Sequence, residues 1–131
     1  MHPQFLFLEM TIISAEELNL GSFPLKKNTF VTVHSGLQHH ATTNIDKQGS
    51  SYPSWNEKFD IQWPRTVQYI AIEVKRQTLL GNVMIGMVNL PVTDFTKGYA
   101  AANHIHFLSY VLRDRYGVRK GIINLSIRVK E

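Results

Sequence analysis

The chain has 131 residues, 44% hydrophobic and 18% charged, a composition that excludes a disordered chain and is sufficient for one hydrophobic core. Fourteen Lys and Arg against ten Asp and Glu give a net charge of +4, which favours anionic partners such as lipid headgroups or nucleic acid. The absence of cysteine excludes disulfide bonds, thiol catalysis and Cys-based zinc sites, and because no linker-like segment divides the chain we expect one domain over residues 1–131.

Apolar and polar residues alternate with a period of two through most of the chain, which predicts β-strands. In chain order, the expected strands are 6–14, 29–34, 38–44, 55–61, 67–75, 83–90, 104–112 and 123–129, separated by turns that contain Gly, Pro or Asn. The segment 92–99 is expected to hold at most one turn of helix, with Thr93 and Asp94 as candidate caps. Eight short strands of this kind are typical of an all-β sandwich.

Four blocks of residues resemble the C2 domain family and follow one another in the family's order. They are LEMTIISAEEL at 8–18, NTFVTV at 28–33, YPSWNEKF at 52–59 and IG at 85–86, and the third block is the most specific. The resemblance implies an eight-stranded antiparallel C2 β-sandwich. The last segment, GIINLSI at 121–127, resembles the strand that opens the domain in one of the family's two circularly permuted topologies, so here type II topology is implied.

A finer resemblance is to the small plant C2 proteins that associate with the copine BONZAI and restrain cell death. It rests on PLKK at 24–27, GSSYP at 49–53, PVTDF at 91–95 and FLSYVLRD at 107–114. It implies a phospholipid-binding regulator of plant defence and cell-death signalling that acts through a copine-type partner. We expect a cytoplasmic protein that associates peripherally with a membrane, and the plasma membrane is the first candidate. The alternative is a protein–protein interaction module for which lipid binding is incidental.

In the C2 family, calcium lies between three loops and is held mostly by five aspartates, because this ion takes about six to eight oxygen ligands. Counting from the matching blocks places the five positions on Ser22, Asn28, Lys75, Gln77 and Val83. A shift of one residue only replaces Val83 by Asn82, and Asp46 in the second loop is the one carboxylate nearby. These residues predict no calcium, no other metal and no cofactor. The resemblance to the BONZAI-associated group instead implies calcium-dependent lipid binding. The residues and the resemblance therefore lead to opposite predictions about calcium.

Cations replace the acids in the first and third loops, and no Asp or Glu occurs from Leu18 to Asn28 or from Lys75 to Val83. The cations are Lys26, Lys27, Lys75 and Arg76, and the apolar loop tips are Phe23, Leu25, Leu79 and Leu80. Each Lys or Arg near an anionic surface contributes about 1 kcal/mol to binding. We therefore expect weak, salt-sensitive docking on anionic phospholipid. In the alternative interpretation the cations are solvated surface and the apolar tips pack on neighbouring loops.

Histidines mark a secondary basic surface at His39 and His40, on the strand that in many C2 domains binds phosphoinositide. The two side chains point to opposite faces of a strand, so they cannot form a zinc site together. The sequence has no nucleophile elbow, no phosphate-binding glycine loop and no paired carboxylates in a motif. We expect no catalytic residues and no enzyme activity.

The last hairpin, around Tyr116 and Gly117, carries charges of alternating sign. They are Arg113, Asp114, Arg115, Arg119 and Lys120. We interpret them as charges that keep a turn soluble. A nucleic-acid groove is not expected, because the aromatic residues are committed to the core.

Overall fold

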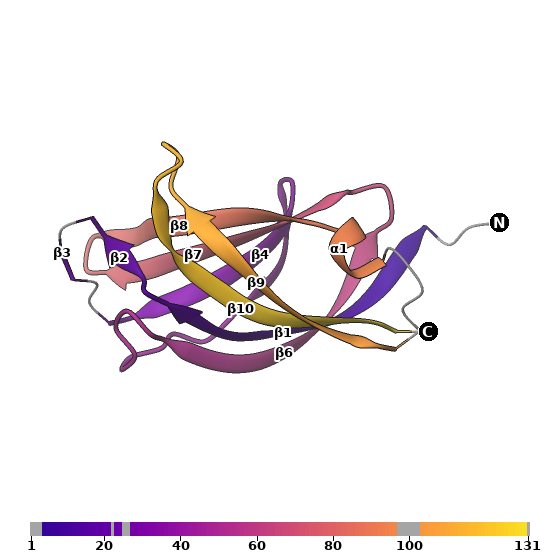
Figure 1. Ribbon diagram of the computed structural model, residues 1–131, viewed down its shortest axis with the longest axis horizontal. Helices are drawn as coiled ribbons and strands as arrows, with labels where there is room; N and C mark the ends of the chain where they lie inside the picture. The colour runs from indigo at the N-terminus through magenta and orange to yellow at the C-terminus, as the bar shows by residue number, and fades with distance from the viewer. Residues whose placement is uncertain (1–3, 22, 25–26, 97–102, 131) are drawn as a thin grey trace.

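A computed structural model describes residues 4–21, 23–24, 27–96 and 103–130, with only the backbone of Phe23 and Pro24 (Figure 1). The eight main strands are β1 (Phe5–Glu16), β4 (Thr29–Ser35), β5 (Gln38–Thr42), β6 (Ser54–Pro64), β7 (Tyr69–Thr78), β8 (Gly81–Pro91), β9 (Ile105–Arg113) and β10 (Arg119–Lys130). A two-stranded ribbon of β2 (Asn19–Leu20) and β3 (Phe23–Pro24) and one helical turn, α1 (Thr93–Thr96), complete the described elements.

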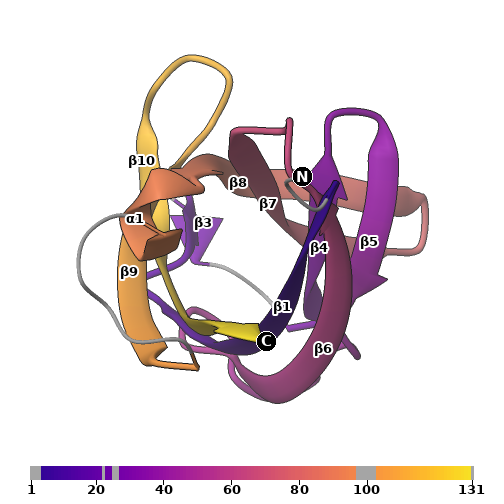
Figure 2. The same ribbon diagram turned by 90° about the vertical axis from the view of Figure 1, so that its right-hand side faces the viewer.

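The main strands form one continuous antiparallel order, β5-β4-β7-β8-β9-β10-β1-β6. Along the order of paired strands, one half, β5-β4-β7-β8, is joined to the other, β9-β10-β1-β6, by a single residue pair, Met87 with Arg113. The two halves therefore curve around a common interior as a near-barrel sandwich (Figure 2). The last strand, β10, lies between β9 and β1, as type II topology requires. The expected eight-stranded antiparallel all-β sandwich is confirmed.

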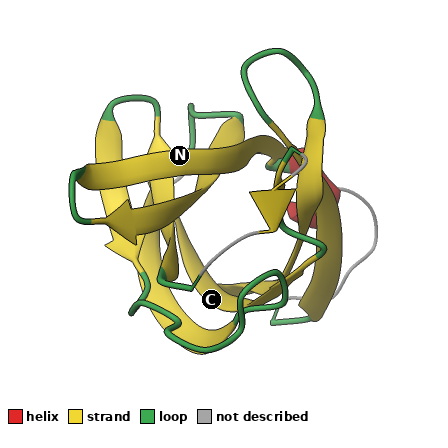
Figure 3. Ribbon diagram, turned by 90° about the vertical axis from the view of Figure 1, so that its left-hand side faces the viewer, coloured by secondary structure: helices red, strands yellow, loops and turns green. Residues whose placement is uncertain are grey.

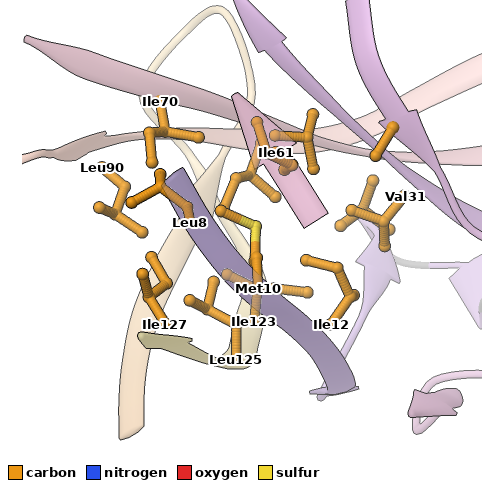
Figure 4. Packing of buried hydrophobic residues seen from close by; sticks show 14 of the residues in the cluster. Leu8, Met10, Ile12, Val31, Ile61, Ile70, Leu90, Ile123, Leu125 and Ile127 are labelled. Carbon is orange, nitrogen blue, oxygen red and sulfur yellow. The ribbon is translucent and has the colours of Figure 1, made fainter. Parts of the chain in front are cut away.

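The core lies between the two halves and follows from the alternation along each strand. In β1, Leu8, Met10 and Ile12 are fully buried, and Ile70 of β7 faces them from the other half (Figure 4). Complete burial of one such side chain stabilises the fold by about 1.5–3 kcal/mol. These alternating apolar positions therefore hold the strands that position the loops.

Strand existence agrees with the sequence-based expectations, while several boundaries differ. The strand expected at 55–61 runs to Pro64, so the fully buried Trp63 was missed. Its indole N–H donates to the Val67 carbonyl at 2.9 Å, which explains how a polar N–H is accommodated in the core. The β2–β3 ribbon was not predicted, because two-residue strands leave no alternation to read.

Four chain connections meet at one end of the sandwich, which we call the loop end. They are residues 17–28 after β1, 43–53 between β5 and β6, 79–80 between β7 and β8, and 114–118 between β9 and β10. This end lies on the left in Figure 1 and faces the viewer in Figure 3. The opposite end holds the start of β1 and the end of β10, where Phe7 pairs with Lys130.

Gly121 in β10 lies against the start of the first loop. An added Cβ would lie 2.8 Å from both the Glu16 carbonyl oxygen and Leu18 Cδ2, and φ is +140°. We expect Gly121→Ala to lower the free energy of unfolding by about 2 kcal/mol, from backbone strain together with the clash. Urea unfolding measures this. The matched control is Gly117→Ala, with φ of +80° but open space around the Cβ, and an equal loss in both would contradict the close-approach explanation.

Candidate functional site

The β7–β8 turn presents two leucines at the loop end with nothing packed over them. Leu79 and Leu80 are 104% and 101% exposed, and we call this pair the apolar tip. The Thr78 hydroxyl donates to the Gly81 carbonyl at 2.6 Å and accepts the Leu80 N–H at 3.2 Å, which closes the turn. The alternative in which these tips pack on neighbouring loops does not hold for Leu79 and Leu80.

Two of the predicted cations, Lys27 and Arg76, lie together at the loop end, and Arg76 precedes the apolar tip by three residues in the chain. Lys27 is exposed, and Arg76 Nε donates to the Lys27 carbonyl at 3.3 Å. Lys75 points elsewhere, along the outer face of the sheet, with its Nζ 3.7 Å from Glu73 Oε1. Because Glu73 offsets its charge, Lys75 contributes less positive potential to the loop end than Lys27 or Arg76 does.

Several predicted site residues lie outside the described part of the chain. They are Ser22, Leu25 and Lys26, and the side chain of Phe23 belongs with them. Apart from Lys27, the first-loop half of the predicted membrane contact therefore stays a prediction. The third-loop residues Lys75, Arg76, Leu79 and Leu80 are all described, and their positions can be compared with the prediction.

Those predicted calcium positions that lie within the described residues offer few suitable oxygen atoms. Asn28 is held in a left-handed conformation with φ of +78°, and its carbonyl accepts the Gln77 N–H at 2.9 Å. Val83 presents an apolar, 43% exposed side chain. Over residues 4–21, 27–96 and 103–130, no three His, Cys, Asp or Glu side chains gather closely enough to hold a metal. Calcium independence remains a prediction.

Asp46, the carboxylate of the second loop, is already engaged by the backbone. Its Oδ1 accepts the N–H groups of Gln48 at 2.9 Å and Gly49 at 2.6 Å, and its Oδ2 accepts that of Ser54 at 2.9 Å. Burial raises the pKa of Asp46, but these three hydrogen bonds outweigh it and hold the pKa below its ordinary value. The side chain therefore organises the second loop, and three of the roughly four acceptor sites of its carboxylate are already used by backbone N–H groups.

A cavity of about 580 Å³ lies between the second and third loops. Its walls are Phe30, Thr42, Thr43, Asn44, Ile45, Lys47, Gln77 and Asn82. The lining holds amides, hydroxyls and one cation, Lys47, but no carboxylate, and the nearby Glu57 accepts the Asn44 N–H at 2.6 Å. Such a lining suits an anionic group better than a cation. Lys47 was missed from the sequence, because cations were counted only in the first and third loops.

The histidines of the secondary basic surface point to opposite faces, as expected for neighbours in a strand. His39 faces outward, with Nε2 2.6 Å from Thr42 Oγ1 and its ring 5.3 Å from that of His34. The His40 ring lies 4.9 Å from that of Trp63. Burial, followed by the nearby His39 and His34, lowers the pKa of His40, so it gains positive charge only below the usual range for histidine.

Comparison with known proteins decides the family. A model of the C2 domain matches residues 7–107. The chain belongs to the C2 domain family. Solved structures agree with this C2 fold: a C2 domain of plant Extended Synaptotagmin 1 has a TM-score of 0.75 at 17% identity, covering 99% of this chain and 97% of that one. A C2 domain-containing protein from a putative elicitor-responsive gene also has a TM-score of 0.75, at 18% identity, covering 96% of this chain and 89% of that one.

Two relatives test the predicted similarity to the BONZAI-associated C2 proteins. BON1-associated protein 2 of Arabidopsis thaliana is 42% identical over 127 residues, covering 94% of this C2 chain and 61% of that protein. Protein SRC2 of Glycine max is 26% identical, covering all of this chain and 48% of that protein. The chain thus spans about half to three fifths of these relatives. The predicted similarity to BONZAI-associated C2 proteins is confirmed.

Proposed function

We propose that this C2 domain binds anionic membrane surfaces peripherally, without calcium, and has no catalytic role. The observation that carries the proposal is the full exposure of the apolar tip, Leu79 and Leu80, at the same end of the sandwich as Lys27 and Arg76. Apolar side chains flanked by cations match the boundary between lipid headgroups and acyl chains. No helix in the described parts of the chain is long and apolar enough to cross a membrane.

The expected affinity is modest. Partial insertion of two leucines contributes about 3 kcal/mol, and Lys27, Arg76 and Lys47 add about 1 kcal/mol each. The sum of roughly 6 kcal/mol, reduced by the cost of ordering the loops, corresponds to a dissociation constant on the order of 0.1 mM. Because half of this free energy is electrostatic, binding weakens as salt rises.

The test of calcium independence is sedimentation with vesicles of phosphatidylcholine and phosphatidylserine, in chelator and in calcium. We expect the two affinities to agree within about twofold, because no carboxylate lines the cavity between the second and third loops. Loss of binding in chelator would show a calcium site that the described loop residues do not explain. No binding in either condition would end the membrane proposal.

Removing both cations beside the apolar tip, by Lys27→Gln with Arg76→Gln, should weaken vesicle binding about 25-fold, from about 1 kcal/mol per charge. The same sedimentation assay measures this at low salt. The matched control removes two charges away from the loop end, by Lys58→Gln with Lys130→Gln, on strands β6 and β10. Equal losses in the two double variants would mean that net charge alone, and no localised site, attracts the vesicle.

We further propose that this domain acts with a copine-type partner at the plasma membrane, in plant defence and cell-death control. The support is the name of the 42% identical relative, which associates that protein with BON1. The competing function is a protein-interaction module for which lipid is incidental. Pull-down with recombinant BON1, with and without vesicles, separates them: binding that needs no vesicle and is unaffected by Lys27→Gln with Arg76→Gln favours the interaction module.

A further inference from the structure

A second protruding element rises from the loop end, the hairpin between β9 and β10. Asp114 closes it: its N–H donates to the Val118 carbonyl at 3.0 Å, and its Oδ1 accepts the N–H groups of Tyr116 at 2.9 Å and Val118 at 3.0 Å. Gly117 takes the left-handed conformation that the turn needs, with φ of +80°. The hairpin is therefore preorganised, and its one carboxylate is used within it.

The charge of this hairpin is strongly positive. Residues 113–120, which we call the basic hairpin, hold four cations and one anion, a net charge of +3. Arg119 lies 3.6 Å from Glu17, and Lys120 lies 3.8 Å from Asp114. Within the described part of the chain, Arg113 and Arg115 have no carboxylate partner, and both are exposed. Two positive charges are thus left for an anionic surface.

The end of the basic hairpin is also partly apolar. Tyr116 is 75% exposed and Val118 52% exposed. The Arg115 guanidinium lies 4.8 Å from the centre of the Tyr116 ring, and its Nη2 donates to the Tyr116 hydroxyl at 2.7 Å. Tyrosine and arginine both place an apolar body in a membrane interface while the polar end stays among headgroups. This chemistry matches anionic lipid.

The position of the basic hairpin allows it to meet the same surface as the apolar tip. Its root lies next to the first loop, where Gly121 approaches Glu16 and Leu18. The hairpin projects from the body of the sandwich in Figures 1 and 2, and Figure 3 shows it at the upper right of the loop end, across from the β7–β8 turn. A flat surface that touches both elements fixes the tilt of the domain.

We propose that the basic hairpin is a second membrane contact, in which Arg115 binds anionic headgroups and Tyr116 lies at the lipid–water interface. The inference rests on the proposed membrane function and adds a site to it. The hairpin and the apolar tip together hold the domain in one orientation. A copine-type partner would then meet the domain on a surface that this orientation leaves facing the cytoplasm.

Single-cysteine labelling tests the inference, because the chain contains no cysteine. An environment-sensitive fluorophore is attached to Tyr116→Cys, to Leu80→Cys, and to Leu37→Cys in the β4–β5 turn, a fully exposed control at the opposite end. With phosphatidylserine-containing vesicles we expect a blue shift at positions 80 and 116 and none at 37. A shift at 80 but not at 116 overturns the hairpin contact and leaves the proposed function standing. A shift at neither position overturns both.

A charge variant gives a second, independent readout. Arg115→Gln should weaken vesicle binding about fivefold, and Lys58→Gln, which removes an equal charge from the face of β6, should change it by less than about twofold. Thermal unfolding of both variants shows whether the fold is intact. Equal affinities for Arg115→Gln and Lys58→Gln would overturn the assignment of headgroup binding to Arg115.

Discussion

Replacing Leu79 and Leu80 together with Ser is expected to lower the affinity for phosphatidylserine-containing vesicles by about 100-fold, or roughly tenfold for each side chain. The free energy of unfolding should not fall, because both side chains are fully exposed and contribute nothing to the core. Vesicle sedimentation measures the affinity, and urea unfolding measures the stability. Together, the two measurements separate the contribution of Leu79 and Leu80 to membrane binding from any contribution to stability.

The control for this variant is Leu37→Ser. Leu37 is also fully exposed, at 106%, but it lies in the β4–β5 turn at the end away from the loops. Its replacement should leave vesicle binding unchanged. If the Leu79 and Leu80 variant bound vesicles as well as the natural chain does, insertion of the β7–β8 turn would be wrong, and the proposed binding would have to be purely electrostatic.

Asp46→Ala is expected to lower the free energy of unfolding by about 3 kcal/mol. The variant loses three hydrogen bonds from backbone N–H groups to a charged acceptor, and the expected loss lies below the sum of three full bonds because solvent reaches the loop. Urea unfolding measures the loss. Asp60→Ala is the matched control, since that carboxylate is exposed and its pKa is lowered by its hydrogen bond to the Lys130 ammonium group, so a smaller loss is expected.

The Asp46 contribution should depend on pH in a defined direction. Its pKa is lower in the folded chain, so the stabilisation is present above the ordinary aspartate pKa of about 3.9 and is lost as pH falls through the folded value. The difference in stability between the natural chain and Asp46→Ala should therefore narrow below about pH 4. A fully stable variant that had instead lost calcium binding would make Asp46 a metal ligand and contradict this account.

The fold was largely predictable, because apolar and polar residues alternate along each main strand and this alternation can be read from one sequence. The strands of the core needed only the spacing of residues such as Leu8, Met10 and Ile12. Boundaries were less predictable: β6 was ended at Ile61, although the alternation of Phe59 and Ile61 continues to Trp63 before Pro64 ends the strand. Nothing local in the chain marks where the facing half of the sandwich ends.

The sequence was sufficient to predict which types of residue form the candidate site, but not which of these residues lie close together. Lys75 and Arg76 are neighbours in the sequence, yet they leave opposite faces of β7, so only Arg76 joins Lys27 while Lys75 meets Glu73. Lys47 belongs to the site because the second loop folds back on Asp46. The basic hairpin was interpreted as a solubilising turn, and its relation to the loop end required the position of β10.

By itself, the sequence determined the all-β class, the C2 family, the absence of carboxylates at the five positions predicted for calcium and the presence of apolar residues at the third loop. These properties depend on residue identity and local spacing, which the chain carries directly. Only the tertiary structure decided which charges are left for a partner, because ion pairs and hydrogen bonds such as Lys75 with Glu73 and Asp46 with Ser54 depend on how strands and loops are placed. Whether Leu79 and Leu80 are covered was also decided by packing, and packing left them exposed.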